Sequence, residues 1–494
     1  MRRRLPIFYS ALLLTGVNLL LRLVSTSFQV HISARIGAAG VGLLQLVLSV
    51  GALAMTAGMA GVRTATMYLT AEELGKGRPQ NVTWVLSGCF LYSVLCSGAI
   101  ALTLYTTAPF LAQNWIGDPR TVDAIRLYAG CIPLVCLCGC MTGYFTTANR
   151  IGTLAAVEIA EQLCYMVVTM TVLQFWAGSD PARACEAVVF GSCISSCLTL
   201  CCLVILRLKE HPPKAMPIPI RRRLLESAVP LALADDVKAG ISTTENLMVP
   251  KRLALYPGET APLATFGMVC GMVFPILMFP AAILFALAEL LIPELARCSA
   301  AGSKQRIRYL VRRGLRVAML YGCVCCGILY LLSGDLCVAI YHNPLAGVHL
   351  RRYSVLVPML YCDAITDAMT KGLGQQKACV RYNICTSAMD VLLLFLLLPR
   401  FGMDGYFISF TVTHLINFAL SLRRLLRISQ VRIPFYTAAF SCAATVLAVA
   451  GASFMGSPTG RVAAFAGLWS SLLVLLRVVS AEDLRWLKGL LGKK

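Results

Sequence analysis

Charged residues are scarce in this sequence, and acidic residues are scarcer than basic ones. Asp, Glu, Lys and Arg make up 14% of the 494 residues, whereas an average soluble domain has about 25%. Only 23 residues are acidic, against 44 Lys and Arg. No polar stretch is long enough for a soluble domain, and no G-x-x-x-x-G-K-[ST] phosphate loop is present. The sequence therefore argues against a soluble multidomain protein and against an ATPase module in this chain.

Apolar residues account for 58% of the sequence and gather into fourteen runs. Each run is about 20 residues or longer, the length of a helix that crosses a hydrocarbon core about 30 Å thick. We therefore expect an all-α polytopic membrane protein with about 14 transmembrane helices. The predicted spans are 6–30, 40–66, 82–107, 122–147, 154–177, 183–207, 224–247, 262–293, 315–340, 350–371, 380–398, 403–424, 433–454 and 460–480.

The basic residues indicate the orientation in the membrane. With the N-terminus placed inside, most of the 44 Lys and Arg fall on the inner side of the predicted spans. This is the positive-inside pattern, so we expect a multi-pass protein of the plasma (inner) membrane with both termini in the cytoplasm. The net charge of +21 then reflects topology and attraction to anionic lipid headgroups. No nucleic-acid partner is predicted.

A basic, proline-rich joint divides the sequence. Residues 208–223 are read as a cytoplasmic linker between an N-terminal six-helix lobe, 1–207, and a C-terminal six-helix lobe, 224–427. Residues 428–494 are predicted to form two appended helices and an amphipathic tail. The 22 cysteines lie mostly within predicted spans, where they serve as small packing residues. We expect no metal site and no cofactor.

Polar residues on the first helix form one face. Asn18, Arg22, Ser25 and Gln29 follow one another at steps of four, three and four. An arginine in a membrane helix keeps its charge, so it must face water, a carboxylate or an anionic ligand. Three further basic residues within spans join this stripe as candidate substrate-binding residues of a cavity: Arg63, Arg126 and Lys238.

Five acidic residues are candidates for binding a coupling ion, either H+ or Na+, because carboxylates in a membrane cavity can hold either. They are Glu158, Glu161, Asp235, Asp363 and Asp367. Two alternatives stay open. Asp367 precedes Lys371 by four residues, so an ion pair on one helix is equally consistent, and Lys238 beside Asp235 could be an intramembrane ion pair.

Six motifs in order resemble the family of stage V sporulation protein B and its polysaccharide-exporter relatives. They are Gly37–Gln45, Glu158–Gln162, Val249–Leu253, Phe279–Glu294, Thr370–Gln376 and Leu398–Tyr406. The resemblance places the chain with the multidrug, oligosaccharidyl-lipid and polysaccharide exporter superfamily. It implies two six-helix lobes around a central cavity that alternately faces each side, often with two extra helices. One departure is Tyr165, where relatives often carry arginine.

The leading hypothesis is a flippase, not an enzyme, for a polyprenyl-diphosphate-linked cell-envelope saccharide, serving peptidoglycan, polysaccharide or spore-envelope synthesis. A diphosphate headgroup needs fixed cations in a low-dielectric cavity. The expected partners are that lipid-linked saccharide, membrane lipids and a coupling ion, with the protein acting as a monomer. The alternative is an ion-coupled multidrug or metabolite antiporter that would use Asp235, Asp363 and Asp367. A membrane enzyme would need a larger outer loop, and a non-transporting assembly partner stays open.

Overall fold

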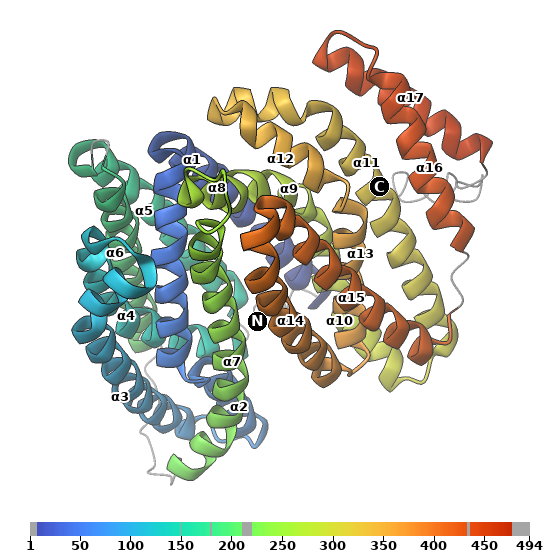
Figure 1. Cartoon of the computed structure of the whole chain (residues 1–494). Coiled ribbons are helices and arrows are strands. Elements are labelled where there is room, and N and C mark those ends of the chain that lie inside the picture. Colours follow the sequence, from blue (N-terminus) through green and yellow to red (C-terminus); the bar gives the residue numbers. More distant parts are fainter. Residues whose placement is uncertain (1–6, 149, 178–179, 210–219, 432–434, 477–494) are drawn as a thin grey trace. The chain divides into compact units, whose positions relative to one another are not determined.

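A computed structural model describes residues 7–148, 150–177, 180–209, 220–431 and 435–476, and no strand occurs among them (Figure 1). Short π-helical or 3-10 turns extend some of the helices. The helices are α1 (Ile7–Met59), α2 (Val62–Gly75), α3 (Gln80–Phe110), α4 (Val122–Thr147), α5 (Ile151–Val172), α6 (Pro181–Leu208), α7 (Arg221–Leu253), α8 (Pro262–Met268), α9 (Phe274–Met278), α10 (Ala281–Ala300), α11 (Lys304–Tyr341), α12 (Pro344–Ser354), α13 (Val357–Gly372), α14 (Gln376–Phe401), α15 (Met403–Ser429), α16 (Phe435–Ala452) and α17 (Pro458–Leu475).

Length and hydropathy of these helices confirm the predicted class, an all-α polytopic membrane protein. Within the described residues, nine helical segments can cross a bilayer, or ten if the bent pair Pro262–Met278 and Ala281–Ser299 forms one span. The total of about 14 stays a prediction. α7 is not among the nine, and it carries Asp235, Asp236, Lys238 and Glu245 along its length. Such a helix is stable in a bilayer only where its polar side chains meet protein or water.

The connection between the first two predicted spans, 6–30 and 40–66, differs from the predicted one. Instead of a joint near 31–39, α1 continues through a single kink at Gly37, where φ is 72°. The predicted span 40–66 is wrong as one helix, because α1 ends at Met59. Ala60 and Gly61 then have φ values of 43° and 69°, in the left-handed region that ends a right-handed helix.

Two other predicted spans are also divided, and each break lies next to a proline. Span 262–293 is interrupted at Phe279–Pro280, between α9 and α10. Span 350–371 is interrupted at Val355–Leu356, just before Pro358 in the first turn of α13. Proline has no N–H to donate and disfavours helical backbone in the residue before it, so a helix breaks at these positions.

The chain forms two compact units. Unit 1 comprises Met1–Gly271 with Asp390–Gly405, and unit 2 comprises Met272–Met389 with Tyr406–Lys494. In unit 1, α1 contacts α3, α4, α5, α6, α7 and α8; in unit 2, α11 contacts α10, α12, α13, α16 and α17. The lobe boundary at 208–223 stays a prediction, since most of that linker lies outside the described residues, as does the tail after 476. α7 packs on α1 within unit 1.

Small residues bring the helices of each unit together. In unit 1, an added Cβ at Gly61 would lie 2.5 Å from the carbonyl oxygen of Ala228, so α2 and α7 meet backbone to backbone there. Cys89 and Cys140 are fully buried in the same core cluster. In unit 2, the Phe465 ring of α17 lies against Gly327 of α11. All 22 cysteines are free thiols.

The turns before α4 and α6 share an arginine. Asp118 and Asp180 each accept a hydrogen bond from a backbone N–H two residues later. The Arg120 guanidinium pairs with Asp118 at 2.8 Å and approaches Asp180 at 3.7 Å. Hydrogen bonds from Arg120 hold the pKa of the Asp118 carboxyl below its ordinary value. The starts of α4 and α6 therefore lie at the same end of unit 1.

Candidate functional site

A cavity of about 270 Å³ lies between α1 and α7 in unit 1. Both helices supply hydroxyl and amide side chains to it, and every residue of its lining is uncharged. The lining consists of Gln45, Leu48, Ser49 and Ala52 from α1 and Ala239, Ser242, Thr243 and Asn246 from α7.

Hydrogen bonds to Ser49 hold the two helices together beside this cavity. The Thr243 hydroxyl donates to the Ser49 carbonyl oxygen at 3.0 Å, and the Asn246 amide donates to Ser49 Oγ at 3.0 Å. The Ser49 hydroxyl in turn donates to the Gln45 carbonyl oxygen at 2.7 Å. Amides and hydroxyls of this kind both donate and accept, so the cavity wall suits a neutral ligand rich in hydroxyl or amide groups.

The predicted stripe on the first helix is only partly described. Asn18 and Arg22 lie on α1, but their side chains fall outside the described part of the structure. Ser25 is half-buried and Gln29 is exposed. Neither of these two lines the α1–α7 cavity, so the role of the stripe stays a prediction.

The other predicted cations lie on three different helices of unit 1. Arg63 on α2 and Lys238 on α7 are exposed, and Lys238 directly precedes the cavity residue Ala239. Arg126 on α4 is half-buried, with its guanidinium carbon 5.2 Å from the centre of the Tyr105 ring. None of the three cations lines the cavity. Their role in binding an anion stays a prediction.

The acidic candidates on α5 are half-buried. Arg63 is close enough to Glu158 to act electrostatically on its carboxylate, and Glu161 lies one turn further along α5. Tyr165, which stands where relatives often carry arginine, makes an edge contact with the Phe28 ring of α1 at 5.4 Å. The Tyr165 ring therefore packs α5 against α1.

The remaining acidic candidates differ in their surroundings. Asp235 on α7 is exposed. In unit 2, Asp363 accepts a hydrogen bond from the Asn417 amide at 3.2 Å. Asp367 pairs with Lys371 at 2.6 Å, which is the ion pair that their spacing made possible. The Asp367 carboxylate therefore already has a cation beside it.

Two carboxyl groups that face each other were not among the candidates. Glu245 of α7 is half-buried and lies close enough to Asp390 of α14 for the two carboxyls to interact electrostatically, and the Asp390 residue is only 7% exposed. Together the two carboxyls offer oxygen atoms from two helices that a proton or a cation could bind. The sequence shows Glu245 on the polar face of its helix, but periodicity alone does not say which other helix that face meets.

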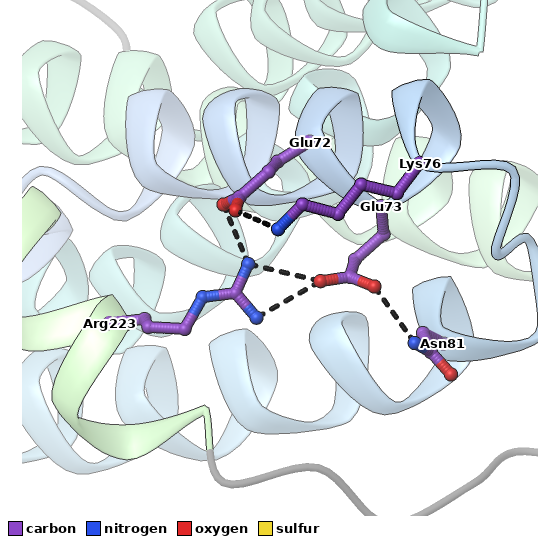
Figure 2. Close-up of polar contacts among 5 residues, drawn as sticks. All are labelled: Glu72, Glu73, Lys76, Asn81 and Arg223. Carbon is purple, nitrogen blue, oxygen red and sulfur yellow. Dashed lines mark hydrogen bonds and ion pairs between the residues drawn. The ribbon is translucent and has the colours of Figure 1, made fainter.

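A cluster of ionic side chains joins the start of α7 to α2 and α3, and Figure 2 shows its five residues. Arg223 of α7 contacts Glu72 at 2.6 Å and Glu73 at 3.0 Å. Glu73 is 2% exposed, and its second oxygen accepts from the Asn81 amide at 2.8 Å. Lys76 pairs with Glu72. The buried Glu73 carboxylate therefore depends on Arg223 for its charge compensation.

We predict that Arg223→Gln lowers the free energy of unfolding by about 2 kcal/mol, between the values typical of exposed and of buried pairs. The reason is that Glu73 stays buried without its cation. Thermal and denaturant unfolding of the purified protein measures the change. Lys76→Gln is the control, because Lys76 is exposed and such pairs contribute about 0.5 kcal/mol.

The double variant Glu73→Gln, Arg223→Gln should be less destabilised than the sum of its two single variants, since it leaves no unpaired buried charge. Strict additivity of the two single changes would contradict this account of the cluster.

Comparisons with known proteins agree along most of the chain. The MatE family model matches residues 14–178. Stage V sporulation protein B of Bacillus subtilis (strain 168) is 23% identical over 96% of this chain and 96% of its own length.

Solved structures show the same fold. A structure of the lipid II flippase MurJ, in an inward closed conformation, matches 94% of this chain and 99% of its own with a TM-score of 0.69 and 11% identity. An inward-facing multidrug resistance MATE family transporter of the MOP superfamily matches 85% of this chain and 100% of its own, with a TM-score of 0.63 and 14% identity. The chain therefore has the fold of the MATE and MurJ transporters, and its resemblance to stage V sporulation protein B and the related exporters is confirmed.

Proposed function

We propose that this protein is a secondary-type flippase that moves a polyprenyl-diphosphate-linked saccharide outward by alternating access. The process it serves is cell-wall, polysaccharide or spore-envelope synthesis, and it acts as a monomer with both termini in the cytoplasm. Its resemblance to stage V sporulation protein B over 96% of the chain supports a place in envelope synthesis. A fold shared with a lipid II flippase over 94% of the chain is consistent with a lipid-linked substrate.

The observation that carries the proposal is the chemistry of the α1–α7 cavity. Its polar groups are the amides and hydroxyls of Gln45, Ser49, Ser242, Thr243 and Asn246, which match the hydroxyl and amide groups of a saccharide. An exporter of organic cations would favour carboxylates or aromatic rings in its lining. This lining has neither, which favours the flippase over the multidrug antiporter that the same fold also supports.

We predict that Asn246→Ala reduces saccharide-lipid translocation about tenfold, the equivalent of about 1.4 kcal/mol, because it removes an amide from the cavity wall. The measurement is translocation in vesicles that contain matched amounts of protein. Thr244→Ala is the matched control, since Thr244 is exposed on the same helix and its hydroxyl donates to the Gly240 carbonyl oxygen one turn earlier. Equal translocation rates for the two variants would show that the cavity does not bind the transported saccharide. Transport of cationic drugs without transport of the saccharide lipid would favour the antiporter.

Arg22 is proposed as a contact for the diphosphate. A guanidinium on the polar stripe of α1 can supply a charge-assisted, bidentate contact with phosphate. We predict that Arg22→Ala slows translocation by about 10- to 150-fold while folding and membrane insertion persist, because about 1.5–3 kcal/mol of this contact is lost. Arg22→Lys should restore only part of the rate, since an ammonium keeps the charge without the fork.

Complementation of a flippase-deficient strain, with expression levels matched, tests both Arg22 variants. Full activity of the alanine variant would show that Arg22 does not contact the headgroup.

Ion coupling is proposed for the Glu245–Asp390 pair, in addition to the candidates on α5, α7 and α13. The pair links α7, which lines the cavity, to α14. Binding of H+ or Na+ would relieve the repulsion between the two carboxylates and hold the helices together. Release of the ion would let them separate. The occupancy of this pair can therefore bias the position of a cavity helix.

We predict that Glu245→Gln removes the stimulation of transport by an imposed H+ or Na+ gradient, while translocation down the substrate gradient persists. The neutral amide removes the repulsion between carboxylates that binding of an ion would otherwise relieve. Vesicle assays with and without each gradient measure this. Glu294→Gln is the control, because Glu294 pairs with Arg306 at 2.7 Å. Gradient stimulation that survives in the Glu245 variant would assign coupling to another site.

A further inference from the structure

A second cavity lies wholly within unit 2, where the end of α11 meets α12, the end of α16 and the start of α17. Its volume is about 500 Å³. None of its lining residues is a candidate for binding the transported substrate or the coupling ion. The lining includes two arginines, one aspartate, two serines and one tyrosine: Arg351, Arg461, Asp335, Ser333, Ser453 and Tyr330.

The charges in this cavity do not cancel. Arg461 Nη1 contacts the Asp335 carboxylate at 3.1 Å and donates to the Leu331 carbonyl oxygen at 2.9 Å. Its Nε is buried without a hydrogen-bond partner among the described residues. Arg351 is exposed and lies over the Tyr330 ring at 4.5 Å, with no acidic residue of the described chain paired to it. The lining therefore holds two guanidinium groups and one carboxylate, which pairs with Arg461.

Exposed apolar side chains lie within about two helical turns of these cations in the sequence, and two of them are part of the lining. Val348 and Met455 line the cavity and are 65% and 47% exposed. Leu345 is 65% exposed and Phe454 is 86% exposed. A cationic recess beside exposed apolar residues matches an amphiphile whose headgroup is anionic and whose tail is hydrocarbon.

We propose that this cavity binds the phosphate-bearing headgroup of an anionic membrane lipid. Arg351 supplies a guanidinium with no acidic partner among the described residues, Arg461 supplies a second guanidinium in the same lining, and both groups suit phosphate oxygens. The tail would lie along the apolar residues named above. Such a lipid would stay bound to unit 2 whether or not the protein moves a saccharide.

The charge pattern along α11 indicates which leaflet supplies this lipid. The start of α11 carries Lys304, Arg306 and Arg308 and therefore lies on the predicted cytoplasmic side. The cavity adjoins the opposite end, near Asp335, so the lipid comes from the outer leaflet. Because Arg351 belongs to α12 and Arg461 to α17, a bound phosphate would bridge these two helices of unit 2.

Native mass spectrometry of the full-length protein in detergent, titrated separately with phosphatidylglycerol, phosphatidylcholine and inorganic phosphate, tests the proposal. Phosphatidylglycerol should bind at least tenfold more tightly than phosphatidylcholine, and Arg351→Gln should weaken it about tenfold. Arg183→Gln is the matched control and should leave binding within about twofold, because Arg183 is also exposed and lies over an aromatic ring, Trp176, outside this cavity.

Asp335→Asn separates binding from folding, since it removes the competing carboxylate and should strengthen phosphatidylglycerol binding. Three results would each overturn the proposal. They are equal affinity for the two lipids, unchanged phosphatidylglycerol affinity in the Arg351 variant, and binding of inorganic phosphate as tight as that of phosphatidylglycerol. The last would indicate a site for free phosphate.

Discussion

In a hydrocarbon environment a polar side chain is stable only when another group of the protein or water meets it, and this constraint shapes unit 1 around α7. The helix carries too many charged residues to face lipid on all sides. Its start is held by Arg223 against Glu72 and Glu73, and its middle by Thr243 and Asn246 against Ser49. Each contact pairs polar groups that would otherwise oppose the insertion of α7 into the membrane. Polar contacts therefore hold α7 against α1 and α2.

The cost of burying unpaired polar groups also bears on the two cavities, whose linings differ in charge. Between α1 and α7 the wall offers neutral donors and acceptors, which bind and release a polar ligand without the high desolvation penalty of a charge. In unit 2 the recess keeps an excess of positive charge at one end of α11. The α1–α7 cavity therefore suits a substrate that is bound and then released, whereas the cavity of unit 2 suits a ligand that stays bound.

The lengths of the apolar runs were sufficient to predict the helical membrane class. Helical periodicity also indicated the possible Asp367–Lys371 pair, because both residues lie on one helix. The contacts between helices were beyond it: Glu245 and Asp390 are 145 positions apart, and no pattern within either helix identifies the other. Breaks at Pro280 and Pro358 follow from visible prolines, whereas Gly37 only kinks α1, since one left-handed residue can redirect a helix without ending it.

The backbone contact between Gly61 and Ala228 has a mechanical consequence. No side chain fits between α2 and α7 there, so the two helices can tilt about this point more easily than they can slide past it. Arg223 lies about 8 Å along α7 on one side of this fulcrum, and Asn246 lies about 27 Å along it on the other. If α7 tilts as one rigid body about this contact, a small movement of Arg223 away from Glu72 and Glu73 produces a displacement three to four times larger at Asn246 in the cavity wall. The helix would then act as a lever with unequal arms.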